Sequence, residues 1–175
     1  MAGCCLGVAR AAEVPRPAPQ VSFKLPSGQA LSLANFKGKV VLLKFFLTEC
    51  PHCQRTTSHI VLIYREWKSR GLEVLGVAIN PDARERLPEF AARFNVTYPL
   101  AMGDSGMVRT FGDLSVVKQF FVPYIFMIDR RGNIRYEHPG GDSSFYDAQK
   151  EEGNLRAELD KLLKEPGPAR KASAR

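Results

Sequence analysis

Two cysteines separated by two residues constrain this chain more than any other feature of its sequence. Cys50 and Cys53 enclose Pro51 and His52, and they follow directly on an apolar run at residues 40–47. A run of that length is typical of a buried strand, and proline is typical of the first position of a helix. We therefore expect a strand to end just before the cysteines and a helix to begin at them.

The N-terminus of a helix favours a thiolate. The backbone N–H groups of the first turn lack partners there, and the helix dipole adds partial positive charge. We expect Cys50 to be the exposed nucleophile that reacts as a thiolate, and Cys53, one turn later, to lie close enough to attack a mixed disulfide. His52 can donate toward the Cys50 sulfur or, when protonated, attract its charge. Such an arrangement suits the transfer of a disulfide between proteins.

Length and composition exclude several classes of protein. The chain has 175 residues, of which 45% are hydrophobic and 25% are charged, as is typical of a single globular domain. Part of its net charge of +7 lies in the last residues, and no basic stripe with interleaved aromatic residues occurs. We therefore expect no nucleic-acid partner. No apolar run approaches the ~20 residues that span a bilayer, so we also expect no integral membrane span.

The chain divides into three parts. Residues 1–20 are expected to be a flexible extension or a signal remnant, residues 21–164 one folded domain, and residues 165–175 a disordered basic tail. The three prolines within residues 13–20 exclude a helix or a central strand in that segment.

The first residues carry an ambiguous targeting signal. Ala9, Arg10 and Ala11 resemble a signal-peptidase site, although the basic region that begins a signal peptide is missing. We favour the remnant of a signal or lipoprotein peptide, with Cys4 in the second case, and hence an exported protein that is periplasmic or tethered on the outer side. An extension without a targeting role, in a cytoplasmic protein, stays open.

Strands and helices alternate along residues 21–164. Strands are expected at residues 21–25, 30–33, 40–47, 72–79, 98–102, 121–129 and 134–138. Helices are expected at residues 51–69, around residues 87–94 with Pro88 in the first turn, at residues 107–111, and from Leu155 to near Gly167. This order predicts an α/β fold in which a central mixed sheet carries helices on both faces.

Taken together, these motifs resemble the thioredoxin superfamily, and within it the exported TlpA/ResA-like branch, which is related to the alkyl hydroperoxide reductase/thiol-specific antioxidant domain. The resemblance covers residues 21–164. It rests on residues 31–42, on the cysteine pair, on residues 90–106 and on residues 122–129. It implies a thioredoxin-like fold with an N-terminal β-hairpin and a central αβ insertion.

The resemblance also implies roles for individual residues. The bond between Val122 and Pro123 is implied to be cis and to lie against the cysteine pair, with the preceding backbone free to pair with an extended substrate. The dipeptide Pro51-His52 resembles that of strongly oxidising DsbA-type enzymes. A stabilised thiolate favours the reduced form, which makes the pair more oxidising.

Two positions depart from the family's pattern. The residue before the first cysteine is usually Trp and here is Glu49, which we expect to shape partner choice at the rim. Six residues before that cysteine the family carries a buried acid or amide that helps deprotonate the second cysteine, and here Lys44 stands there. A buried Lys44 is expected to tune the thiolate or to relay a proton. In the other interpretation its ammonium reaches solvent at the sheet edge.

The favoured function is a thiol–disulfide oxidoreductase. Cys50 attacks or receives a disulfide through a mixed intermediate, and Cys53 resolves it. We expect no organic cofactor and no metal, protein thiols or disulfides as substrates, an upstream redox partner, and a monomer. The direction of electron flow stays open, because the Pro-His dipeptide favours an oxidant and the TlpA/ResA-like body favours a reductant.

Two other functions stay open. A peroxiredoxin-like thiol peroxidase would place Thr three residues before its reactive cysteine, where this chain has Leu47. A metal-binding or metal-delivery module would use the two cysteines as ligands, but zinc usually takes four.

Overall fold

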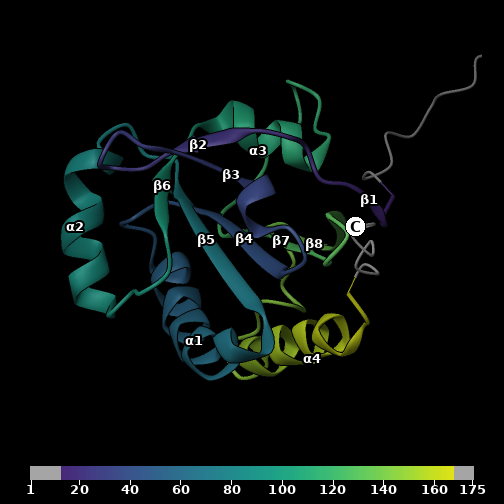
Figure 1. Cartoon of the computed structure of the whole chain (residues 1–175). Coiled ribbons are helices and arrows are strands. Elements are labelled where there is room, and N and C mark those ends of the chain that lie inside the picture. Colours follow the sequence, from purple (N-terminus) through teal and green to yellow (C-terminus); the bar gives the residue numbers. More distant parts are fainter. Residues whose placement is uncertain (1–12, 168–175) are drawn as a thin grey trace, which may run out of the picture.

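The computed structural model describes residues 13–167, and an eight-stranded sheet forms their centre (Figure 1). The strands are β1 (Arg16–Pro17), β2 (Ser22–Lys24), β3 (Ala30–Ser32), β4 (Val40–Phe46), β5 (Leu72–Ala78), β6 (Leu100–Met102), β7 (Tyr124–Ile128) and β8 (Asn133–His138). Their order in the sheet is β1-β8-β7-β4-β5-β6-β2-β3. Because β4 pairs in parallel with β5 and antiparallel with β7, the sheet is mixed, as predicted.

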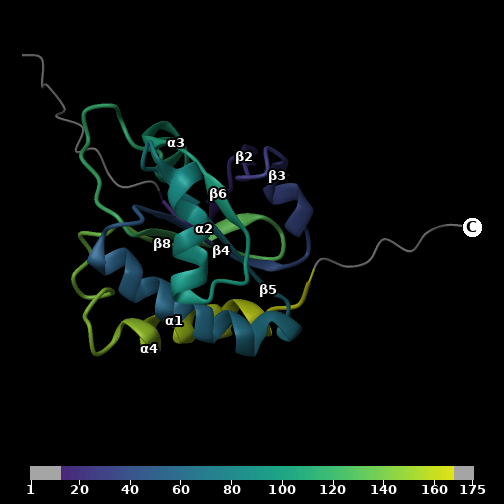
Figure 2. The same ribbon diagram turned by 90° about the vertical axis from the view of Figure 1, so that its left-hand side faces the viewer.

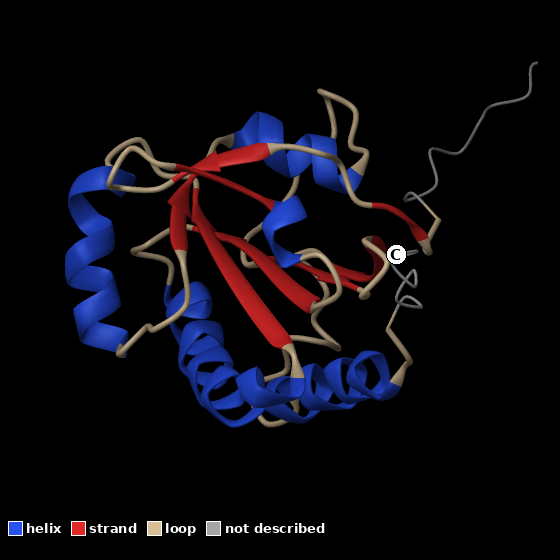
Figure 3. Ribbon diagram, viewed as in Figure 1, coloured by secondary structure: helices blue, strands red, loops and turns tan. Residues whose placement is uncertain are grey.

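Four α-helices of the described chain surround the sheet. They are α1 (Pro51–Trp67), α2 (Ala83–Phe94), α3 (Ser105–Gly112) and α4 (Glu151–Lys164), and two short 3-10 helices span Leu33–Phe36 and Lys68–Arg70. Helices α1 and α4 lie side by side on one face, α3 lies on the other, and α2 flanks the sheet beside β6 (Figures 2 and 3). The predicted α/β architecture with helices on both faces is confirmed. Within residues 13–167, no helix is long and apolar enough to cross a bilayer.

Strand β4 divides the core into two halves. All seven of its residues are buried, and successive side chains point to opposite faces of the sheet. Val40 and Leu42 pack in the apolar cluster beneath α1 and α4, whereas Val41 and Phe45 pack in the cluster beside α3. By the same alternation, Lys44 faces α1 and α4. The strand thus carries a lysine into the core at the end nearest the cysteines.

The start of α2 differs from the prediction. The helix begins at Ala83, so Pro88 lies in its second turn and not in its first. Pro88 cannot donate a hydrogen bond to the carbonyl of Arg84, but Arg84 is exposed to water, which can satisfy that carbonyl. Ala83 and Leu87 are buried against the sheet, and their packing extends the helix past the expected start.

The N-terminal boundary also differs from the expected one at residue 20. Arg16–Pro17 forms strand β1, which pairs with β8 at the edge of the sheet, a position that tolerates proline. The Arg16 guanidinium donates to the Glu137 carboxylate (2.6 Å) and to the carbonyl of Phe111 (2.7 Å). The segment from Arg16 onward is therefore part of the domain. Cys4, the signal-like motif and residues 168–175 lie outside the described residues.

An imidazole links the end of β8 to α4. His138 lies between the carboxylates of Asp142 (3.1 Å) and Glu158 (2.8 Å), and its ring stacks on Phe145. Burial opposes the charged form of the ring, but the bonds and charges of Glu158 and Asp142 together outweigh burial and raise the pKa of His138. The contact therefore stabilises the folded chain as an ion pair.

We expect the substitution His138→Gln to lower the free energy of unfolding more at about pH 5.5 than at about pH 8.5. Because the folded-state pKa is raised, the stabilisation is fully present below the unfolded pKa of about 6.5 and is lost as the pH rises through the folded value. Urea unfolding of both proteins at the two pH values measures this difference. An equal loss at both values would contradict the ion pair.

Candidate functional site

The cysteine pair lies where β4 gives way to α1. Pro51 is the first residue of α1 and Cys50 is its N-cap, so the sulfur takes the place of the usual capping oxygen. The backbone N–H of Cys53 donates to Cys50 Sγ at 3.5 Å. Both cysteines are free thiols, Cys50 partly exposed and Cys53 fully buried. The geometry thus separates an accessible thiol from a protected one.

The two thiols differ in what they can do at neutral pH. Burial raises the pKa of Cys53 to about 12, although the charge of Lys44 lowers it. Cys53 is therefore a thiol until something draws its proton away. Cys50 Sγ instead lies at the N-terminus of α1, where it accepts a hydrogen bond from the backbone N–H of Cys53.

The segment before β7 lies against Cys50. The Val122–Pro123 peptide bond is cis, and the carbonyl oxygen of Val122 lies 4.0 Å from Cys50 Sγ. Gly140 holds this segment in place, since its N–H donates to the carbonyl of Phe121 (3.0 Å). A Cβ at Gly140 would come within 2.8 Å of the Val122 carbonyl group, so the close approach of the two backbones requires glycine.

The dipeptide between the cysteines faces solvent. Pro51 and His52 are both exposed, and His52 Nδ1 lies 3.5 Å from an Arg55 nitrogen. A guanidinium can only donate, so Nδ1 is the acceptor in this contact. Among the described residues, no hydrogen bond joins His52 to Cys50 in this dithiol form.

Glu49 lies at the rim of the site, as expected from its place before Cys50. Its carboxylate is exposed and pairs with Arg86 of α2 at 2.6 Å. The pair puts a negative and a positive charge beside the accessible thiol.

Lys44 lies beneath the first turn of α1. Only 1% of its surface is exposed, and β4 is central, so the interpretation in which it reaches solvent at a sheet edge is wrong. Its ammonium donates to the carbonyl of Cys53 (3.3 Å) and to Thr57 Oγ1, and it lies 4.6 Å from the centroid of the Phe46 ring. Burial lowers the pKa of Lys44 to about 8, against the opposing charges of Cys53, Glu151 and Cys50.

Glu151 is the residue of the site that sequence reasoning missed. It is the first residue of α4 and is fully buried. Its carboxylate pairs with Arg55 Nε at 2.8 Å and accepts a hydrogen bond from Thr56 Oγ1. An acidic residue in the first turn of a helix is usually a surface feature, and no local pattern places Glu151 beside Thr56. The only signal in the sequence was the pair of threonines after Cys53.

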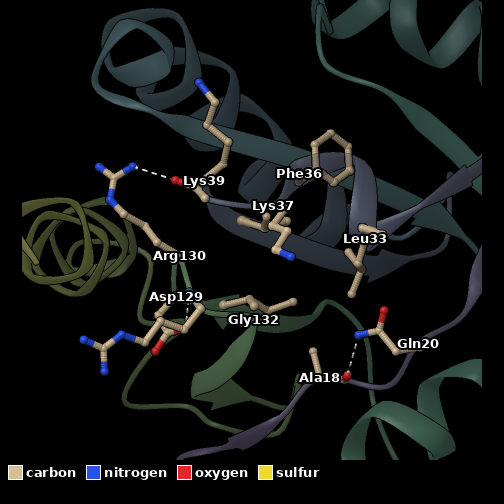
Figure 4. Close-up of a pocket in the computed structure, with 14 residues that line it drawn as sticks. Ala18, Gln20, Leu33, Phe36, Lys37, Lys39, Asp129, Arg130 and Gly132 are labelled. Carbon is tan, nitrogen blue, oxygen red and sulfur yellow. Dashed lines mark hydrogen bonds between the residues drawn. The ribbon is translucent and has the colours of Figure 1, made fainter. Parts of the chain in front are cut away.

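The pocket in Figure 4 lies at the far end of β4 from the cysteines. It is formed by the loop before β4 and the turn between β7 and β8, where Arg130 donates to the carbonyl of Gly38 at 3.1 Å. It contains none of the site residues named above. Within residues 13–167, no group of three or more His, Cys, Asp or Glu side chains could hold a metal ion.

Comparison with known proteins gives one family match and several relatives. The family model described as Redoxin matches residues 13–155. Over 117 residues the chain is 29% identical to the thiol-disulfide oxidoreductase ResA of Halalkalibacterium halodurans, covering 65% of this chain and 61% of ResA. Over 115 residues it is 30% identical to the protein DipZ of Mycobacterium bovis, covering 63% of this chain and 16% of DipZ. The chain thus spans less than two thirds of the length of both relatives.

Solved structures share the fold. A thiol:disulfide interchange protein of the thioredoxin family from Chlorobium tepidum matches with a TM-score of 0.70 and 26% identity, over 87% of this chain and 99% of that one. A thiol:disulfide interchange protein from a Bacteroides species matches with a TM-score of 0.62 and 22% identity, over 79% and 89% of the two chains. The second likeness concerns the fold alone. Together they confirm the predicted thioredoxin-like fold.

Proposed function

The chain belongs to the Redoxin family, and from that premise we propose that it is a thiol–disulfide oxidoreductase. The observation that carries the proposal is the cysteine pair at the start of α1, where Cys50 is accessible and Cys53 is buried one turn behind it. Similarity to ResA, which is named a thiol-disulfide oxidoreductase, supports the same activity.

The reaction proceeds in two exchanges. Cys50 attacks a substrate disulfide, so that the bond between the substrate sulfurs breaks, a Cys50–substrate disulfide forms, and one substrate thiolate leaves. Cys53 then loses its proton and attacks Cys50 Sγ, which releases the second substrate thiolate. Two electrons pass from the cysteine pair to the substrate, and the reverse sequence oxidises a substrate dithiol. No organic cofactor or metal takes part.

The residues around Cys50 position the substrate. Val122 and Pro123 present the backbone against which an extended polypeptide lies, 4.0 Å from the reactive sulfur. Glu49, paired with Arg86, provides the charge that selects partners at the rim. Pro51 starts the helix at Cys50, and His52, when protonated, stabilises the Cys50 thiolate that attacks the substrate disulfide in the first exchange.

The partners follow from this chemistry. The substrates are protein thiols or disulfides, and a second redox protein must restore the cysteine pair after each turnover. We propose that the protein acts as a monomer outside the cytoplasm. The resemblance to an exported branch and the signal-like motif at residues 9–11 support that location.

The reduction potential of the Cys50–Cys53 couple tests the function and gives its direction. We expect a reversible two-electron titration in glutathione or dithiothreitol buffers, with a potential between roughly −270 mV, as in thioredoxin, and roughly −120 mV, as in DsbA. The titration uses a Cys4→Ser/Cys5→Ser protein, so that alkylation and mass mapping report only the redox state of Cys50 and Cys53. A value near the upper limit indicates a disulfide donor, and one near the lower limit a reductant. Failure to form the disulfide at any buffer ratio would contradict the proposal.

A further inference from the structure

A buried cation and a buried anion flank the first two turns of α1. The Lys44 ammonium comes from β4 and the Glu151 carboxylate from α4, and both side chains are essentially inaccessible to water. Burying either charge alone is costly, so each needs a compensating partner. Neither group is used in the two exchanges described above. Lys44 donates to the carbonyl of Cys53, and Glu151 contacts Arg55 and Thr56 on the next turn of the helix.

Two adjacent threonines bring the charges to the same turn. Thr56 donates to the Glu151 carboxylate, and Thr57 accepts from the Lys44 ammonium while donating to the carbonyl of Cys53 at 2.8 Å. The ammonium also donates directly to that carbonyl. Arg55 fixes the other oxygen of the carboxylate. The arrangement leaves the Lys44 charge at the carbonyl of Cys53 and the Glu151 charge at Thr56, three residues further along the helix.

We propose that Glu151 is a positioning residue for disulfide exchange, whose buried carboxylate keeps the Lys44 ammonium charged beneath Cys53 so that Lys44 stabilises the Cys53 thiolate during resolution. The inference rests on the proposed function, because it concerns the second exchange of that reaction. In the family that the sequence resembles, a single buried acid or amide assists the second cysteine. We assign that role here to two charges, one from β4 and one from α4.

The directions of the pKa shifts agree with the roles proposed for Glu151 and Lys44. Burial lowers the pKa of Lys44, and the Glu151 charge raises it; burial raises the pKa of Cys53, and the Lys44 charge lowers it. Glu151 thus acts on Cys53 through Lys44. The other titratable groups around the pair are Cys50, Arg55 and His59 of α1, Tyr146 before α4 and Tyr98 before β6. Burial raises the pKa of both tyrosines above 10, so they stay neutral in the range tested below.

The pH dependence of resolution follows from the proton balance. The reactive form has a protonated Lys44 and a deprotonated Cys53. Below the pKa of Lys44 this form requires the loss of one proton to solvent, so the rate rises tenfold per pH unit. Above that pKa, Lys44 is already neutral and the reactive form arises by moving the Cys53 proton to Lys44. The rate then reaches a plateau, and we expect the wild-type inflection near pH 8.

The experiment uses the chromogenic disulfide dithiobis(nitrobenzoate) with the full chain carrying Cys4→Ser and Cys5→Ser. The first nitrothiobenzoate is released when Cys50 attacks, and the second when Cys53 resolves. In Glu151→Gln we expect the inflection of the second phase to move down by about one pH unit and the plateau to fall about tenfold, since one unit is a factor of ten. Below about pH 6.5 the two profiles should coincide, and the first phase should change less than about twofold.

Control variants separate this role from a structural one. Glu152→Gln changes the neighbouring, half-exposed carboxylate of α4, and His59→Gln removes the imidazole that faces Glu151; both should keep the wild-type inflection. Glu151→Asp should restore part of the plateau. A general loosening of the site would instead slow the second phase equally at every pH, and that result would overturn the proposal.

A second variant tests the proposal without changing Glu151. In Lys44→Met the inflection should disappear, and the rate should rise with pH without a plateau up to the titration of Cys53. A Lys44→Met protein that keeps the inflection overturns the proposal, even if Glu151→Gln fails to fold. If the wild type releases no second nitrothiobenzoate, that result would instead contradict the proposed function itself.

Discussion

Replacing Cys53 with serine is expected to turn the protein into a trap for its substrates. Cys50 keeps its place at the N-cap of α1 and still attacks a disulfide, but a serine hydroxyl cannot resolve the adduct. Intramolecular attack by well-oriented groups corresponds to effective concentrations of about 10⁵ M or more. Without it, turnover of a disulfide-bonded protein such as insulin should fall by at least about 1000-fold, and the mixed disulfide should accumulate on a non-reducing gel.

The matched control for the trap is Cys50→Ser. Both variants are made in the Cys4→Ser/Cys5→Ser protein, so the thiol that remains in Cys50→Ser is Cys53. That thiol is fully buried and its pKa is raised to about 12, so we expect neither turnover nor adducts. Adducts on Cys53 in that variant would contradict the division of roles. Peroxide consumption that survives Cys53→Ser would instead favour the thiol peroxidase that the sequence leaves open, because that chemistry needs one reactive cysteine.

Most of the fold was predictable because its determinants are local. The apolar run before Cys50 and the helical spacing of Ile60, Ile63 and Tyr64 each define an element without reference to the rest of the chain. The start of α2 was not predictable, since it depends on the burial of Ala83 in an apolar cluster that also includes Phe46 of β4 and Ala78 of β5. The rule that proline belongs in the first turn of a helix fails for Pro88, because the burial of neighbouring side chains favours an earlier helix start.

The candidate site, like the fold, was predictable where its determinants are local in the sequence. The cysteine pair and Pro123 follow from short motifs, and Lys44 was recognisable as an anomaly at its position. The surroundings of the site were not predictable, because Glu151 comes to Arg55 and Thr56 from the last helix and Gly140 comes to Val122 from a loop. Sequence separation hides such contacts, so the charge that balances a buried lysine cannot be located without the fold.

The two faces of strands β4 and β7 contribute to different properties of the protein. On the face toward α1 and α4, Lys44 places a charge beside Cys53. On the face toward α3, a group of aromatic side chains fills the core, and Phe126 of β7 lies at its centre. Its ring stands edge-on to Phe45 (6.1 Å between centroids), is tilted against Phe111 (5.6 Å) and is stacked on Tyr124 (4.8 Å). Stability and redox chemistry should therefore respond to different substitutions.

Phe126→Ala should lower the free energy of unfolding by about 3–5 kcal/mol, because it removes a fully buried ring and leaves a cavity. A domain of this kind has about 5–15 kcal/mol in total, so the loss is a large fraction of its stability. Urea unfolding measures it, with the exposed Val117→Ala as the control that should change stability by less than about 0.5 kcal/mol. In the folded variant, both phases of nitrothiobenzoate release should stay within about twofold of the wild type. A shift of the second-phase inflection in Phe126→Ala would show that the two faces are coupled, because the ring is separated from Lys44 only by the sheet itself.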